Sequence, residues 1–254
     1  MPHAGRSLPP PEPVQRATLD LEHGAMCYDA TRVRQPSPAL FDPHDPGLKA
    51  VPVGQGGRQA AWFVEGEFGH GVLRHYRRGG AIARVNKDRY VWRGAKATRS
   101  MAEFDVLARM HERGLAVPRP LAAAYWRSGL VYGAAILIER IQQSRTLTEL
   151  VRELPGPGSC AREVAHAVFA MHEAGFWHAD LNAYNILLDP HGKAWLIDFD
   201  KAVEGPVSGS KRAGNLNRLH RSLLKVAPQQ ADVWWKDINH AYKARQGGEN
   251  RTAP

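Results

Sequence analysis

Asp180, Asn185 and Asp198 are three oxygen-bearing side chains that lie close together in this sequence. Phosphoryl transfer needs one carboxylate near the accepting hydroxyl and further oxygen ligands that hold Mg²⁺ against the phosphates. The three residues supply that set. Asp180 is predicted to orient and deprotonate the hydroxyl, and Asn185 and Asp198 are predicted to hold the metal. The chemistry that this spacing indicates is therefore phosphoryl transfer.

A short hairpin would bring the two predicted metal ligands together. Apolar runs at 186–188 and 194–197 have the length of strands, and the Asp-Pro-His-Gly sequence at 189–192 has the residues of a tight turn. Asn185 stands at the entrance and Asp198 directly follows the exit, so both side chains come to one end of the hairpin. A chance string of common loop residues is the alternative, and the intervening strand pattern argues against it.

The surrounding residues follow two patterns of protein kinases. The stretch from His178 to Asn185 matches H-R-D-x-x-x-x-N with Ala179 in place of Arg, and Asp198-Phe199-Asp200 matches D-F-G with Asp in place of Gly. We expect His178 to brace the loop through hydrogen bonds. The missing Gly predicts a less mobile metal loop, and Asp200 is expected to be a solvated acid rather than a metal ligand. No A-P-E sequence follows, which favours a non-protein acceptor.

The residues that would bind the nucleotide depart further from that pattern. Arg74 occupies the position of the phosphate-binding Lys, and Glu103, on an expected helix, is its predicted ion-pair partner. Gly54, Gly56 and Gly57 are predicted to cover the phosphates, because glycines let backbone N–H groups approach phosphate oxygens. The alternatives are that Arg74 and Glu103 are ordinary surface charges and that the glycines form only a loop.

The block from Trp177 to Asp189, together with Trp195 to Lys201, resembles bacterial 3-deoxy-D-manno-octulosonic acid (Kdo) kinases, the lipopolysaccharide kinase branch of the protein-kinase-like fold. Residues 61–64, 72–80 and 215–223 resemble the same family. The resemblance implies ATP- and Mg²⁺-dependent phosphorylation of a hydroxyl, O-4, of the Kdo residue on a lipid A precursor, in lipopolysaccharide inner-core biosynthesis. The residue patterns alone indicate only a kinase.

The order of apolar runs predicts an α+β, protein-kinase-like bilobal fold, with a small antiparallel β-sheet lobe and a mostly helical large lobe. Residues 1–18 are expected to be a disordered Pro-rich N-terminus, 19–139 the N-terminal ATP-binding lobe and 140–254 the C-terminal catalytic lobe. Strands are expected at 59–64, 70–77, 121–126 and 131–138, and helices at 98–113, 159–174, 213–225 and 229–245.

Composition sets outer bounds on these predictions. With 254 residues, 43% hydrophobic and 23% charged, the chain is long enough for one two-lobed domain with a sizeable core. Cys27 and Cys160 match no metal or redox spacing, so we expect reduced thiols. We find neither a signal peptide nor a run of ~18 apolar residues, and we therefore expect a cytoplasmic protein.

The net charge of +9 is concentrated in one segment. Residues 74–99 contain nine Arg and Lys and one Asp, a balance of +8, interleaved with aromatic and aliphatic side chains. This composition predicts peripheral association with the anionic cytoplasmic face of the inner membrane. The alternatives are a solvated charged face or phosphate-binding residues. We expect neither nucleic acid nor an obligate protein as a partner.

A second group of basic residues follows the metal loop. It consists of Lys211, Arg212, Arg218, His220, Arg221 and Lys225, most of them on the expected helix at 213–225. These side chains could hold the carboxylate of Kdo or the phosphates of lipid A, or they could form a solvated helix face.

Two other functions remain open at this point. One is a kinase of a protein or of another small molecule, which would share the same three residues. The other is a nucleotide-binding pseudokinase, against which the intact set of Asp180, Asn185 and Asp198 argues.

Overall fold

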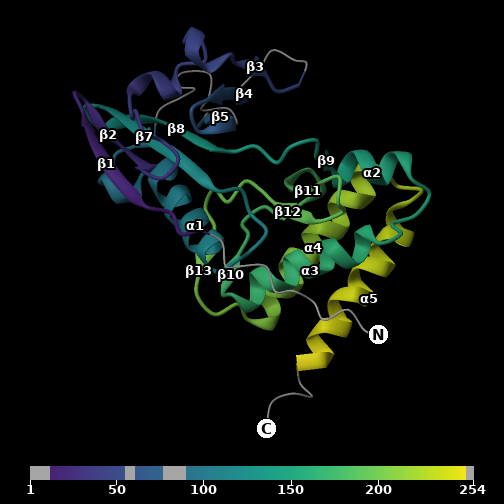
Figure 1. Cartoon of the computed structure of the whole chain (residues 1–254). Helices are drawn as coiled ribbons and strands as arrows, with labels where there is room; N and C mark the ends of the chain where they lie inside the picture. The colour runs from purple at the N-terminus through teal and green to yellow at the C-terminus, as the bar shows by residue number, and fades with distance from the viewer. Residues whose placement is uncertain (1–11, 55–60, 77–89, 250–254) are drawn as a thin grey trace, which may run out of the picture.

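A computed structural model of the chain, which describes residues 12–54, 61–76 and 90–249, shows two lobes (Figure 1). The first lobe is built on one large antiparallel sheet and the second is mostly helical. This confirms the predicted α+β, protein-kinase-like bilobal fold. The sheet lobe contains β1 (Arg16–Leu21), β2 (Gly24–Asp29), β3 (Val51–Pro52), β4 (Ala61–Gly66), β5 (Gly69–His75), β6 (Tyr90–Val91), α1 (Arg99–Glu112), β7 (Pro120–Ser128) and β8 (Val131–Glu139).

The helical lobe also carries short strands. Its elements are β9 (Arg145–Thr146), α2 (Leu147–Glu153), α3 (Cys160–Glu173), β10 (Phe176–Trp177), β11 (Ile186–Leu188), β12 (Ala194–Leu196), β13 (Val203–Glu204), α4 (Gly209–Val226) and α5 (Ala231–Glu249). The predicted hairpin is present, because β11 pairs with β12 in antiparallel register from Ile186↔Leu196 to Leu188↔Ala194. Its turn is held by Asp189, whose Oδ1 accepts hydrogen bonds from the backbone N–H groups of His191 (2.9 Å) and Lys193 (3.0 Å).

The strands of the large sheet follow the order β1-β2-β7-β8-β5-β4-β3, and β6 pairs with β8. The predicted hairpin, helix and two following strands are present as β4–β5, α1 and β7–β8. The β1–β2 hairpin was not predicted, and β1 begins at Arg16, inside the expected disordered segment. Edge strand β1 alternates only between exposed and half-buried residues, so its strand conformation depends on pairing with β2 rather than on an apolar face.

Both faces of the sheet are covered. Phe104 and Leu107 of α1 pack with Ile136 against one face. The segment with two short 3₁₀ helices, Pro38–Phe41 and Pro46–Leu48, packs on the other face. Strands buried on both sides need apolar residues at consecutive positions, which explains the nearly continuous apolar sequences of β7 and β8.

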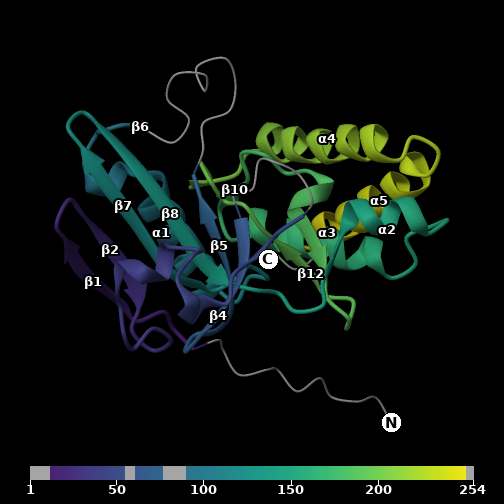
Figure 2. The same cartoon turned by 90° about the horizontal axis from the view of Figure 1, so that it is seen from above.

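The four predicted helices are present with small shifts. The helix predicted at 213–225 begins earlier, at Gly209, where the Ser208 side chain accepts a hydrogen bond from the N–H of Lys211. Gly209 and Gly214 lower the intrinsic helix propensity of this first turn, which hides it from a sequence pattern. Seen from above in Figure 2, α4 runs along one edge of the helical lobe.

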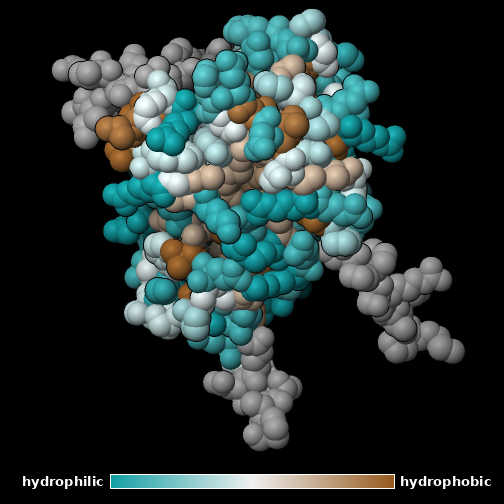
Figure 3. Space-filling model, turned by 90° about the vertical axis from the view of Figure 1, so that its left-hand side faces the viewer, coloured by the Kyte–Doolittle hydropathy of each residue, from teal (hydrophilic) through white to brown (hydrophobic). Residues whose placement is uncertain are grey.

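The described surface gives no sign of a membrane-spanning element. None of the helices within residues 12–249 that the structure describes is both long and apolar enough to cross a bilayer. Figure 3 shows the side of the molecule beside the β1–β2 edge, where hydrophobic residues form only small separate patches in a mostly hydrophilic surface. Isolated apolar residues of this kind are usual on folded domains.

A buried histidine joins three helices of the second lobe. His172 of α3 is 1% exposed, and its Nε2–H donates to Oδ1 of Asn215 on α4 at 3.0 Å. Its Nδ1 therefore accepts the hydroxyl hydrogen of Tyr242 on α5 at 2.8 Å. Burial lowers the pKa of His172 to about 4. The neutral ring is the form that this packing requires.

Because the folded-state pKa of His172 lies below its unfolded value, stability present above pH 6.5 is lost as the pH falls toward 4. We expect the titration of His172 to lower the free energy of unfolding by about 2 kcal/mol between pH 7 and pH 5. Urea unfolding of the wild type and of His172→Gln at both pH values measures it. An equal pH dependence in the two proteins would contradict the assignment.

Candidate active site

The loop that carries Asp180 is held from within by a buried histidine. The Asp180 side chain is 60% exposed, whereas His178 is fully buried. Nε2–H of His178 donates to the carbonyl of Ile197 at 3.0 Å, and its Nδ1 accepts the N–H of Asp180 at 3.0 Å. Burial lowers the pKa of His178, which favours this neutral form. The predicted bracing role is confirmed, and the ring links Asp180 to the residue before Asp198.

The hairpin brings the two predicted metal ligands to the same end. Ile197 N–H donates to the carbonyl of Asn185 at 3.0 Å, so Asp198 directly follows a residue bonded to Asn185. The Asn185 amide nitrogen donates to the carbonyl of Asp180 at 2.9 Å, which leaves the amide oxygen to face a ligand. Asp198 adopts a left-handed backbone conformation with φ 64°. An amide oxygen and a carboxylate are donors that suit Mg²⁺, so these residues fit the predicted metal.

Arg74 joins the sheet lobe to this hairpin. Its Nη2 lies 2.7 Å and 2.5 Å from the two carboxylate oxygens of Glu103, and its Nη1 forms an ion pair with Asp198. Glu103 is 2% exposed and also accepts the hydroxyl hydrogen of Tyr76. Burial raises the pKa of the Glu103 carboxyl, and the positive charge of Arg74 opposes that rise. The predicted pair is present, and Glu103 is not a surface charge.

Asp200 differs from the prediction of a solvated acid. Its carboxylate accepts from Nε of Arg99 at 2.8 Å and is 15% exposed. Arg99 is the first residue of α1, and its Nη1 also donates to the Tyr90 hydroxyl at 2.7 Å. The difference arises because α1 brings the guanidinium of Arg99 to the metal loop. Sequence spacing does not reveal this contact. Asp200, which stands where the kinase pattern has Gly, therefore links the metal loop to α1.

The predicted glycine turn is only partly described. Gly54 follows β3 and has φ 81°, which favours glycine. Gly56 and Gly57 lie outside the described residues. Because β3 pairs with β4 and β4 pairs with β5, Gly54 follows a strand that lies two positions in the sheet from β5, which carries Arg74. The phosphate-covering role of Gly54, Gly56 and Gly57 stays a prediction.

Helix α4 holds the catalytic loop from the other side. The Asn215 amide donates to the carbonyl of His178 at 2.7 Å, and Ser222 Oγ accepts the N–H of Ala183 at 2.9 Å. Between them, Arg218 Nη1 lies 3.1 Å from Oδ1 of Asp180. Asn215 and Ser222 were not among the predicted site residues. Asn215, Arg218 and Ser222 are spaced by three and then four residues, which places them on one helix face. This spacing is the sequence pattern that could have identified them.

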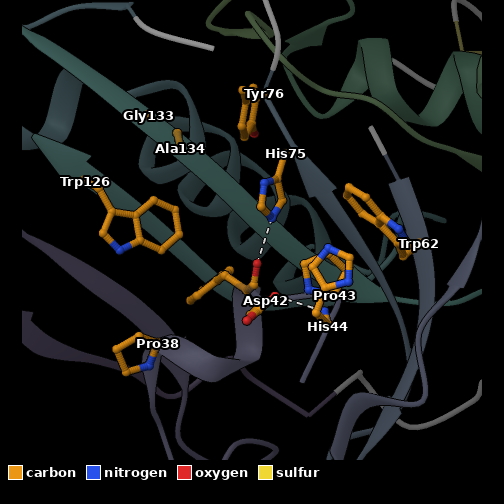
Figure 4. Close-up of a pocket in the computed structure, with 11 residues that line it drawn as sticks. Pro38, Asp42, Pro43, His44, Trp62, His75, Tyr76, Trp126, Gly133 and Ala134 are labelled. Atoms are coloured by element: carbon orange, nitrogen blue, oxygen red, sulfur yellow. Dashed lines mark hydrogen bonds between the residues drawn. The ribbon is translucent and has the colours of Figure 1, made fainter. Parts of the chain in front are cut away.

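Two pockets lie away from these residues. One, of about 540 Å³, lies on the outer face of the sheet between Phe41, Trp62, His75 and Trp126, and His75 Nε2–H donates to the carbonyl of Phe41 at 2.7 Å (Figure 4). The other, of about 560 Å³, lies between the start of α3 and α5. Neither includes a predicted site residue, so the candidate site is defined by its side-chain geometry.

The arrangement defines a class of protein. An exposed carboxylate on a braced loop, an Asn and an Asp at one end of a hairpin, and an Arg–Glu pair reaching across from a β-sheet lobe are the parts of a phosphotransferase with a protein-kinase-like fold. The roles of the individual residues remain predictions from this geometry.

Comparison with known proteins places the chain within that class. The model of the lipopolysaccharide kinase (Kdo/WaaP) family matches residues 47–242, and the chain belongs to this family. A 3-deoxy-D-manno-octulosonic acid kinase of Xanthomonas campestris pv. campestris (strain B100) is 45% identical over 229 residues, 89% of this chain and 92% of the relative. A Stenotrophomonas maltophilia (strain R551-3) protein of the same name is 48% identical over 208 residues, covering 82% and 83%. The chain is an ATP-dependent kinase.

We predict that Arg74→Met costs about 3–5 kcal/mol of stability at pH 7.5, because it leaves the Glu103 carboxylate buried without its cation. Without Arg74 the folded-state pKa of Glu103 rises further above its unfolded value. The deficit should therefore shrink as the pH falls toward 5 and the carboxyl becomes protonated. Urea unfolding at both pH values measures it, with Arg74→Lys as the charge-retaining control. A deficit that is the same at both pH values would show that Glu103 does not depend on Arg74.

Proposed function

We propose that this kinase phosphorylates a hydroxyl, O-4, of the Kdo residue on a lipid A precursor, as a step of lipopolysaccharide inner-core biosynthesis. The carrying observation is the exposed carboxylate of Asp180, a residue whose backbone is held by His178 and Asn185, in a chain whose relatives are named Kdo kinases. An exposed base suits an acceptor that approaches from solvent or from a membrane surface.

In the proposed mechanism Asp180 orients the sugar hydroxyl and receives its proton. Asn185 and Asp198 hold Mg²⁺, which neutralises negative charge on the ATP phosphates when it is bound. Arg74, kept in place by Glu103, holds the phosphates from the sheet lobe. His178 fixes the base relative to Asp198, because its two nitrogens join the backbone of Asp180 to that of Ile197, the residue before Asp198.

The sheet lobe offers a surface for the base of ATP. Phe63, Val72 and Ile138 occupy paired positions on three adjacent strands, on the same face as Arg74. All three side chains are half-buried, unlike the fully buried Leu73 and Leu137 on the opposite face. This half-buried apolar surface beside the phosphate-binding Arg fits a purine ring, with the Arg140 guanidinium carbon 3.6 Å from the centroid of the Phe63 ring.

The first test is transfer of labelled phosphate from ATP to a Kdo-bearing lipid A precursor, with Asp180→Asn as the variant. We expect the variant to bind ATP with unchanged affinity and to lose at least about 100-fold in kcat, the lower end of the usual range for a catalytic base. A generic protein acceptor serves as the control. Label in protein but not in lipid would refute the proposed acceptor, and retained turnover in Asp180→Asn would refute the role of Asp180.

We further propose that the enzyme works at the cytoplasmic face of the inner membrane through the basic segment at 74–99. Half of that segment, residues 77–89, lies outside the described residues, so the support is its charge and its aromatic content.

Replacing Arg84, Lys87 and Arg89 by Gln should weaken binding to anionic vesicles by about 3 kcal/mol, a factor on the order of 100, because each basic residue contributes about 1 kcal/mol near an anionic surface. Vesicle sedimentation measures the change, with zwitterionic vesicles as the control. Undiminished sedimentation with anionic vesicles would remove the basis for this location.

A further inference from the structure

Helix α4 carries five Lys and Arg residues and no acidic residue. The structure separates these cations into two groups. Arg212 forms an ion pair with Glu173 of α3. His220, also on α4, stacks on Trp235 of α5 with ring centroids 4.6 Å apart. Both of these side chains pack within the helical lobe. The other four Lys and Arg residues of α4, here named the basic ridge, are Lys211, Arg218, Arg221 and Lys225.

The basic ridge forms one exposed line along the helix. Its members are spaced by seven, three and four residues, which places them on the same face, and all four are exposed. Arg218, Arg221 and Lys225 are successive like charges at i+3 and i+4 spacing, and such pairs destabilise a helix. If this face were only solvated, an acidic residue at one of these positions would make the helix more stable by forming an ion pair with its neighbours. The uncompensated charge therefore indicates an anionic ligand.

The position of the basic ridge indicates which ligand. Asn215 and Ser222, which share a helix face with Arg218, bind the catalytic loop, and Arg218 lies 3.1 Å from the carboxylate of Asp180. Among the described residues, none of the other three ridge cations forms an ion pair. The ridge thus presents one cation, Arg218, beside the proposed base, with the other three along the same helix face.

We propose that the basic ridge is the acceptor-binding surface and that Arg218 binds the carboxylate of the acid sugar. This inference rests on the proposed function. The planar fork of Arg suits a carboxylate, and a sugar acid is ionised at neutral pH. When the acceptor arrives, Arg218 exchanges the Asp180 carboxylate for that of the sugar, and Asp180 becomes available to the hydroxyl. Arg221 and Lys225, further along the same face, contact phosphates on the lipid part of the acceptor.

The role of Arg218 is tested with two acceptors, the Kdo-bearing lipid and the same lipid with the sugar carboxyl reduced to an alcohol. In the wild type we expect the reduction to lower kcat/KM on the order of tenfold to a hundredfold, the range for a charge-assisted hydrogen bond. Arg218→Gln should process both acceptors at nearly the same rate, and Arg218→Lys should recover part of the preference. A merely structural residue would lower both rates and leave their ratio unchanged, and that result would overturn the assignment.

The rest of the ridge is tested with Arg221→Gln/Lys225→Gln. The matched control is Lys236→Gln/Lys243→Gln, which removes the same charge from exposed positions on α5. The ridge variant should raise KM for the phosphorylated lipid acceptor at least tenfold, and should leave kcat and the KM for ATP within about twofold. With a dephosphorylated lipid the variant should match the wild type. An equal effect in the control, or none in the ridge variant, would overturn the inference.

The two proposals fail in different ways. If the wild type transfers phosphate to no Kdo-bearing acceptor, the proposed function and the ridge inference both fall. If the wild type does transfer phosphate while the ridge and Arg218 variants keep wild-type KM values and carboxylate preference, only the ridge inference falls.

Discussion

The buried carboxylate of Glu103 determines how the two lobes meet. A charge removed from water is tolerated only with a partner of opposite sign and with its hydrogen bonds satisfied. Arg74 and Tyr76 supply those partners, and Arg74 reaches Asp198 with its remaining nitrogen. A Lys has a single nitrogen and would not present two separated edges to the two carboxylates. Arg74, which stands in place of the usual Lys, therefore connects β5 to α1 and to the metal loop.

The catalytic loop depends on a second, uncharged arrangement. His178, Asn215 and Ser222 hold its backbone from opposite sides, so the Asp180 side chain can remain exposed while its main chain is fixed. Both ring nitrogens of His178 are occupied in the neutral state, one as donor and one as acceptor. Because His178, Asn215 and Ser222 bond the backbone of the loop, they leave the Asp180 carboxylate free for the proposed role of base.

The features that could be predicted from the sequence are those set by local spacing. Asn185 and Asp198 are joined by one hairpin, whose strand and turn residues are readable in order, and Arg74 and Glu103 follow from a strand and a helix 29 positions apart. The contact between Arg99 and Asp200 joins residues 101 positions apart, and nothing in either neighbourhood specifies it. Similarly, β1 has no strong apolar face, so its state is decided by β2. Tertiary pairing of this kind leaves no periodic trace in a single sequence.

The tie between Asp200 and Arg99 adds a second link between α1 and the metal loop, beside the one made through Arg74. A helix that swings away from the nucleotide would have to break both links together. If the two contribute about 3 kcal/mol in total, the swung-out form is populated on the order of 1% of the time. Any effector that worked by displacing that helix would have to supply at least this free energy through its preference for the swung-out form.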